Sequence, residues 1–277
     1  IFERRILLTL RPMRNYLILF LLLGSFLFGA CSSYNKVLKS DDYGAKFEMA
    51  NELFEKGEEV NAIALYEQVY QRMPKSSEGE LSYFRIGKGY YTGGDTYMAG
   101  YYLNMFAKRF PASPKAEEAL FLSALCAVSE SPNHSLDQDA TELAISDLQM
   151  FVDNFPNSNL VDSCNNTIDR LRFKLELKEY EAVKLYSKTE SYRAAVSSAI
   201  TFLEDFPMTN YREEITFLLV ENSFHLAKNS VEVKKLKRID DTIERYSTFV
   251  GEFPESKYLN LANRYTEEIR KERNNFK

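Results

Sequence analysis

The side chains that most often carry chemistry are few in this chain and stand apart from one another. The two histidines, His134 and His225, lie in unrelated contexts: a polar stretch and an apolar helical stretch. A metal or nucleophile site would need partners at a usable spacing, and neither histidine has them. Adjacent carboxylates such as Asp240 and Asp241 would point about 100° apart on a helix, which is typical of solvated surface. We therefore expect no catalytic residue, no metal and no cofactor, and we predict that the protein is not an enzyme.

One cysteine lies in a context that suggests covalent modification. An apolar run over residues 16–28 follows Arg14 and ends in Gly29-Ala30-Cys31. A basic start, a short apolar core and small residues are typical of a secretory signal, and small residues before a cysteine resemble the lipobox of bacterial lipoproteins. We predict that residues 1–30 are an upstream extension and signal peptide, that Cys31 is lipidated and that residues 31–42 form a polar tether. The alternative is a plain secretory signal with an incidental cysteine.

The remaining composition restricts the class of partner. Residues 1–30 hold four basic residues and one acidic residue, so the net charge without them falls from −5 to −8. A nucleic-acid-binding protein usually has a basic face and a basic balance, so nucleic acid is not an expected partner. Cys126 and Cys164 could pair in an exported protein, but their apolar surroundings are more typical of buried free thiols.

A short motif repeated five times organises the rest of the chain. In each copy a large apolar residue precedes a proline, and a serine or threonine follows two residues later. Proline cannot continue a helix and disfavours helical backbone at the preceding residue, while the hydroxyl can cap the next helix. The motif therefore predicts one helix ending and another beginning. The five copies, here called the joints, are Met73-Pro74-Lys75-Ser76, Phe110-Pro111-Ala112-Ser113, Phe155-Pro156-Asn157-Ser158, Phe206-Pro207-Met208-Thr209 and Phe253-Pro254-Glu255-Ser256.

Counting back from each proline reveals a constant register. Small residues stand twelve positions earlier and mostly phenylalanine stands five positions earlier, so both lie on one helical face that can pack closely against a neighbour. With the glycine-bearing turns at Gly57 and Gly93-Gly94, this pattern resembles the tetratricopeptide repeat. It predicts an all-α solenoid of about five helix pairs with a C-terminal capping helix. The small residues are Ala62, Ala99, Ala144, Ala195 and Thr242, and the larger ones are Val69, Phe106, Phe151, Phe202 and Phe249.

Uneven spacing between the joints predicts insertions and a division into two halves. Residues 129–138 read as a loop, residues 160–178 as a lengthened helix, and residues 229–240 as a basic loop or helix extension. We assign residues 43–128 to N-terminal repeats and residues 129–277 to C-terminal repeats with the capping helix.

The stacked repeats should present an extended concave surface for an unfolded ligand. In the tetratricopeptide pattern the first helix of each pair lines this surface, and the matching positions combine aromatic rings with an amide and an ammonium group. Such a groove suits an extended peptide that ends in an aromatic residue and a carboxylate. The alternative is that the aromatic rings pack between helices. The candidate groove residues are Phe47, Asn51, Phe54, Phe84, Lys88 and Tyr91.

A lipoprotein signal followed by five such repeats resembles the BamD family of outer-membrane protein assembly lipoproteins. The resemblance rests also on the stretches Ser135-Leu136-Asp137-Gln138 and Tyr211-Arg212-Glu213-Glu214. It implies a subunit anchored by lipid to the periplasmic face of the outer membrane. Such a subunit receives unfolded outer-membrane proteins at its N-terminal repeats and docks the periplasmic domains of the barrel-forming subunit at its C-terminal repeats. The docking role would fall on Arg238, Asp241 and Glu244.

Two other functions remain compatible with the sequence. One is an envelope adaptor of the same repeat type that coordinates cell-wall synthesis. The other is a glycan-binding lipoprotein, which the absence of tryptophan disfavours because sugars commonly stack on tryptophan rings.

Overall fold

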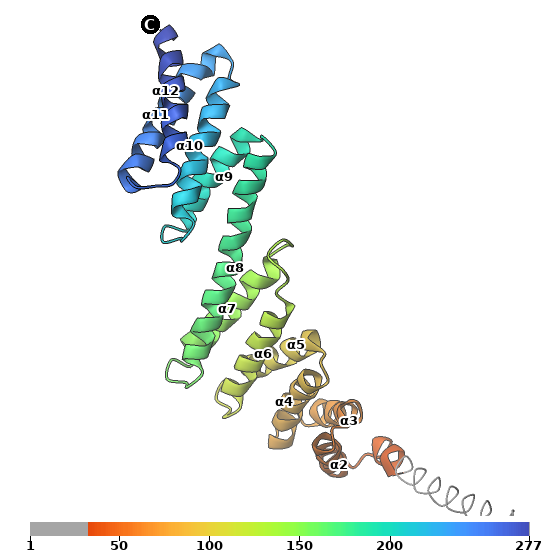
Figure 1. Ribbon diagram of the computed structural model, residues 1–277. Coiled ribbons are helices and arrows are strands. Elements are labelled where there is room, and N and C mark those ends of the chain that lie inside the picture. The colour runs from red at the N-terminus through yellow and green to blue at the C-terminus, as the bar shows by residue number, and fades with distance from the viewer. Residues whose placement is uncertain (1–32, 277) are drawn as a thin grey trace, which may run out of the picture. The chain divides into compact units, whose positions relative to one another are not determined.

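The computed structural model describes residues 33–276, and throughout this range the regular structure is helical (Figure 1). Residues 33–38 form a short helical segment. The helices that follow are α2 (Tyr43–Glu55), α3 (Glu59–Arg72), α4 (Ser77–Thr92), α5 (Thr96–Arg109), α6 (Ala116–Glu130), α7 (Asp139–Asn154), α8 (Val161–Lys188), α9 (Tyr192–Asp205), α10 (Arg212–Lys228), α11 (Glu232–Glu252), α12 (Leu259–Arg273) and the 3₁₀ helix η1 (Asn274–Phe276).

In unit 1, α2 packs against α3 and α4 against α5; in unit 2, α8 packs against α9 and α10 against α11, as the repeat register predicts, and α12 packs against α10 and α11. The all-α repeat architecture predicted from the sequence is thus confirmed. The described chain forms two compact units. Unit 1 contains residues 33–130 and Met150–Ser158, and unit 2 contains Ser131–Gln149 and residues 159–276. The boundary falls inside α7, so that one helix contributes to both units.

The core of each unit contains the small residues that stand twelve positions before a joint proline and the larger ones that stand five positions before it. All ten residues are at most 1% exposed. Each phenylalanine at the fifth position before a proline also packs against the ring just before that proline, as in the pairs Phe106–Phe110 at 5.1 Å and Phe202–Phe206 at 5.2 Å between ring centroids. Burial of so many aromatic rings in a constant register accounts for the regular stacking of the helix pairs.

The joints end their helices in one shared backbone conformation. Met73, Phe110, Phe206 and Phe253 have φ between −130° and −123° and ψ between 55° and 66°. The N–H of each still donates to the carbonyl four residues earlier, for example from Phe110 to Phe106 at 2.8 Å. The chain therefore leaves the helix immediately before the proline, as predicted.

The joint hydroxyls do more than the sequence predicts. Ser76 is a regular N-cap whose Oγ accepts from the N–H of Gly79 at 3.1 Å. In other joints the hydroxyl accepts from the N–H two residues on and donates to a glutamate of the preceding repeat. Ser113 donates to Glu80 at 2.6 Å in unit 1, and in unit 2 Thr209 donates to Glu176 at 2.5 Å and Ser256 to Glu213 at 2.6 Å. These hydroxyls tie successive repeats together.

The turns inside the helix pairs need left-handed backbone. Gly57 and Gly94 have φ of 74° and 83°, a conformation that glycine adopts without steric cost. The corresponding turn between α8 and α9 places Glu190 at φ 56° instead. The prediction of glycine-bearing turns is therefore confirmed for the first two pairs.

The predicted insertions are confirmed, and the first is a highly ordered loop. Residues 131–138 connect α6 to α7, and the long helix α8 holds them in place through Lys174, whose Nζ donates to Ser131 Oγ at 2.6 Å and to the Pro132 carbonyl at 3.0 Å. Gln138, 5% exposed, donates to three carbonyls of the same loop. The basic stretch becomes the first turns of α11, and the terminal segment forms α12.

The N-terminal segment is more structured than a tether. Tyr34, Val37 and Leu38 pack against the core of α2 and α3, so the described part of this segment belongs to unit 1. The predicted lipidation site Cys31 lies outside the described residues. Cys126 and Cys164 are both free and buried, and burial raises the pKa of the Cys126 thiol to about 11.

Candidate peptide-binding groove and docking cavity

The first helices of successive pairs, α2 and α4, border a cavity of about 670 Å³ in unit 1. Three glutamates and one arginine give its lining a mixed but mainly acidic character. The lining residues are Val37, Ala45, Glu48, Met49, Asn51, Glu52, Glu55 and Arg85. Of the predicted groove residues, Asn51 lines this cavity directly. Arg85 was missed by the sequence analysis.

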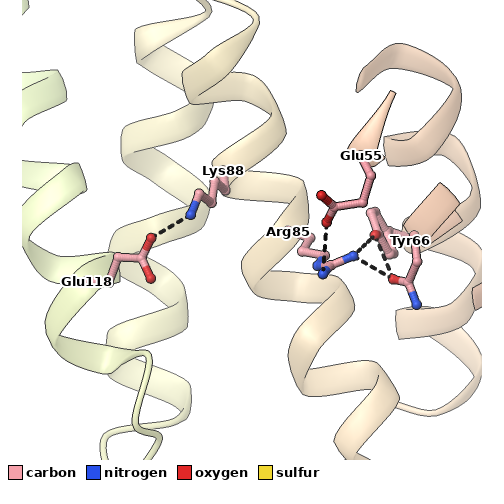
Figure 2. Close-up of polar contacts among 6 residues, drawn as sticks. Glu55, Tyr66, Arg85, Lys88 and Glu118 are labelled. Atoms are coloured by element: carbon pink, nitrogen blue, oxygen red, sulfur yellow. Dashed lines mark hydrogen bonds and ion pairs between the residues drawn. The ribbon is translucent and has the colours of Figure 1, made fainter. Parts of the chain in front are cut away.

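Arg85 is the centre of the polar contacts at this cavity (Figure 2). Its Nη1 donates to Asn51 Oδ1 at 2.8 Å and to the Tyr66 hydroxyl at 2.9 Å. Its Nη2 lies 3.5 Å from a carboxylate oxygen of Glu55, whose side chain is 73% exposed. Its guanidinium carbon lies 5.1 Å from the centre of the Phe54 ring. The guanidinium is therefore positioned by Asn51, Tyr66 and Phe54, whereas the carboxylate that pairs with it is mostly exposed to solvent.

Tyr66 is the buried member of this network. Its ring is fully buried, and its hydroxyl donates to Asn51 Oδ1 at 2.8 Å. Burial raises the pKa of Tyr66, and the nearby Arg85 charge opposes that shift. The rings of Phe47 and Phe54 meet Tyr66 edge to face at 6.4 and 6.2 Å. Two predicted groove aromatics thus flank one buried tyrosine.

Lys88 lies one helical turn further along α4 and points toward the next repeat (Figure 2). Its Nζ is 2.7 Å from a carboxylate oxygen of Glu118 on α6. It also lies 5.8 Å from the ring centre of Phe84, which is 3% exposed and packs on Phe106. Phe84 therefore supports the surface from below, whereas Lys88 lies on it. Tyr91 is half-buried against the same core cluster.

A second cavity, of about 480 Å³, lies in unit 2 between α10 and α11. It contains the predicted docking residues Asp241 and Glu244 but not Arg238, whose Nη1 donates to Ser230 Oγ at 2.6 Å. Its lining residues are Leu203, Arg212, Thr216, Leu219, Lys237, Asp241, Glu244, Arg245, Thr248 and Glu252.

Both positive and negative side chains line this second cavity. Arg212 forms a two-pronged pair with Glu252, with N–O distances of 3.0 and 3.2 Å. Arg245 donates to Ser223 Oγ at 2.6 Å, and burial lowers the pKa of its guanidinium while Asp241 and Glu244 oppose that shift. A surface of this kind suits recognition by charge pattern rather than by apolar burial alone.

Within the described residues, no cluster of three or more His, Cys, Asp or Glu side chains could hold a metal ion. A search of the same residues finds no helix with the length and apolarity needed to cross a bilayer.

The fold defines a class: an all-α helical-repeat protein with two polar cavities. The model of the YfiO family, described as outer membrane lipoproteins, matches residues 40–236. The chain therefore belongs to this family, which confirms the resemblance to BamD proteins noted from the sequence.

Two curated relatives are named outer membrane protein assembly factor BamD. The relative from Caulobacter vibrioides is 26% identical over 167 residues, which cover 60% of this chain and 55% of that protein. The relative from Pasteurella multocida is 21% identical over 212 residues, covering 73% of this chain and 81% of that protein. This chain thus spans about half the length of the first relative. A solved kinesin light chain with TPR-like repeats from Podosopora anserina has a TM-score of only 0.32 and 12% identity, too low to bear on function.

Proposed function

We propose that this chain is a non-catalytic, lipid-anchored subunit of the outer-membrane β-barrel assembly machinery. Cys31 carries the lipid and holds the protein at the periplasmic face of the outer membrane. Unit 1 receives an extended segment of an unfolded barrel protein, and unit 2 docks the periplasmic domains of the barrel-forming subunit. Family membership and the names of the curated relatives support the general assignment.

The observation that carries the substrate role is the position of Arg85. A guanidinium held beside Phe54 and paired to a solvent-exposed glutamate can exchange that glutamate for the carboxylate of a peptide, with an aromatic side chain lying against the neighbouring rings. Glu48 and Glu52 at the rim disfavour acidic peptides. The preferred ligand is an extended segment whose terminal carboxylate follows an aromatic residue and whose remaining charges are neutral or basic.

Peptide binding tests this role directly. Phe54→Ala combined with Tyr91→Ala should weaken the binding of a barrel-terminal peptide, measured by fluorescence anisotropy. Circular dichroism melts of the variant provide the folding control. Unchanged affinity in a folded variant would assign both rings to the core and remove them from the binding surface.

The docking role rests on the mixed-charge cavity of unit 2. Reversing two of its charges with Asp241→Lys and Glu244→Lys should reduce recovery of the barrel-forming subunit when the protein is purified from detergent-solubilised envelopes. The matched control is Glu255→Lys with Glu267→Lys, because both side chains are exposed and neither lines the cavity. Equal losses in both pairs would contradict a specific docking cavity, and a recovered set dominated by cell-wall enzymes would favour the adaptor alternative.

A further inference from the structure

The helical segment at residues 33–38 connects the predicted lipid site to the part of unit 1 where α3 begins. Residues 33–38 pack on the core of α2 and α3 through Tyr34, Val37 and Leu38. The Tyr34 hydroxyl donates to the carbonyl of Asn61, in the first turn of α3, at 3.5 Å. The chain therefore enters unit 1 beside the N-terminal end of α3.

The covalent distance from this entry point to the lipid is short. Cys31 precedes residue 33 by only two positions, which limits the separation of their Cα atoms to about 7 Å. If Cys31 carries acyl chains inserted in a bilayer, as the proposed function requires, the start of α3 cannot lie far from the lipid headgroups.

The same edge carries the large apolar side chains that unit 1 leaves exposed. Val60 is 83% exposed and Tyr97 is 79% exposed. They are the second residues of α3 and α5, and they are separated by the same interval as Pro74 and Pro111. Tyr101, one turn further along α5, is 56% exposed. The two helices are neighbours, because the Tyr102 hydroxyl of α5 donates to Glu67 of α3 at 3.4 Å.

We propose that Val60, Tyr97 and Tyr101 form a membrane-contacting edge that rests in the headgroup region of the bilayer holding the lipid anchor. Tyrosine suits this position because its ring is apolar and its hydroxyl remains hydrated. Isolated exposed apolar residues are ordinary, but here they recur at equivalent repeat positions beside the anchor. The edge fixes the orientation of unit 1: α3 is 14 residues long, so its far end lies about 20 Å along the helix from the edge.

Spin labels on the lipidated protein test this orientation. The protein is reconstituted in vesicles of phosphatidylethanolamine and phosphatidylglycerol, with labels at Val60→Cys or Tyr97→Cys. The matched control is Lys75→Cys, exposed in the joint at the far end of α3. Cys126 and Cys164 are buried, and the unsubstituted protein measures any labelling of them. On vesicle binding, collision with an aqueous nickel reagent should fall several-fold at positions 60 and 97 and stay unchanged at position 75.

The outcomes test the lipid anchor and the membrane-contacting edge one after the other, because the edge depends on the anchor. Mass spectrometry first establishes whether Cys31 is acylated. An unmodified Cys31 would overturn the anchor, and with it the short connection from which the edge is argued. In the acylated protein, labels at positions 60 and 97 that remain as accessible to water as the label at position 75 would overturn the edge alone.

Discussion

Replacing Arg85 with methionine gives the sharpest test of the substrate groove. Methionine keeps much of the apolar volume of the arginine stem but removes the charge and its hydrogen bonds to Asn51 and Tyr66 at 2.8 and 2.9 Å. If Arg85 binds the terminal carboxylate of a peptide, converting that carboxylate to an amide should weaken binding to the native protein. The same conversion should have little effect on the Arg85→Met variant.

The expected magnitude follows from the surroundings of the guanidinium. A charge-assisted hydrogen bond contributes about 1.5–3 kcal/mol when well shielded from water. The Arg85 side chain is 21% exposed and must give up Glu55, so part of that energy is lost. We expect a coupling of about 1.4 kcal/mol, which is roughly a tenfold change in Kd.

The assay is a fluorescence anisotropy titration of the acid and amide peptides against both proteins, arranged as a double-mutant cycle. Arg109→Met is the matched control, because Arg109 belongs to unit 1 and lies 5.2 Å from the Tyr83 ring, away from the cavity lining. The control should keep the full difference between acid and amide. An equal effect of amidation on the native protein and on Arg85→Met would refute the reasoning, whatever the absolute affinities.

Three further predictions concern the repeat architecture. Phe202→Ala removes a ring that is 1% exposed and should lower the free energy of unfolding of unit 2 by about 3–5 kcal/mol, measured by urea denaturation. Gly79→Ala would place a Cβ 1.8 Å from the carbonyl oxygen of Met73 in the first joint, so it should destabilise unit 1 by roughly 1–3 kcal/mol. Burial raises the pKa of Tyr102 to about 12. The free energy of unfolding should therefore be constant in this respect below about pH 10 and decline as the pH rises toward about 12. Tyr102→Phe should reduce part of that decline.

Each of these predictions has a contrary result. Gly251→Ala introduces a Cβ into open space and should be neutral or slightly stabilising; a cost equal to that of Gly79→Ala would rule out the steric account. A change below 1 kcal/mol for Phe202→Ala would mean that the repeat core is less tightly packed than the structure indicates. An identical alkaline decline in the native protein and in Tyr102→Phe would exclude Tyr102 as a contributor.

Much of the fold could be read from the sequence because its signals are local. The joints specify helix ends through the covalent properties of proline, and the fixed intervals before Pro111 or Pro207 place small and aromatic residues on one helical face. Because the same register recurs before all five joints, each copy supports the helix assignment of the others. The positive φ at Glu190 could not be predicted in this way, because no glycine marks the turn between α8 and α9.

The candidate site could be predicted only in outline. Register placed Asn51 and Lys88 on the first helices of their pairs, and the structure gives them polar partners from neighbouring elements. The same register could not distinguish Phe84, which is buried, from Phe54, which lies beside the guanidinium. Equivalent positions in successive repeats differ in exposure because each has a different neighbour.

The sequence by itself determined the repeat, its register, its insertions and the position of a candidate lipid site, since these depend on residue types at short and regular intervals. Tertiary structure decided which side chains meet across repeats. Arg85 meets Asn51 and Tyr66 only when α4 packs against α2 and α3, and Tyr34 reaches the start of α3 only because residues 33–38 dock there. Contacts between residues distant in sequence depend on how helices stack, and no local pattern records that geometry.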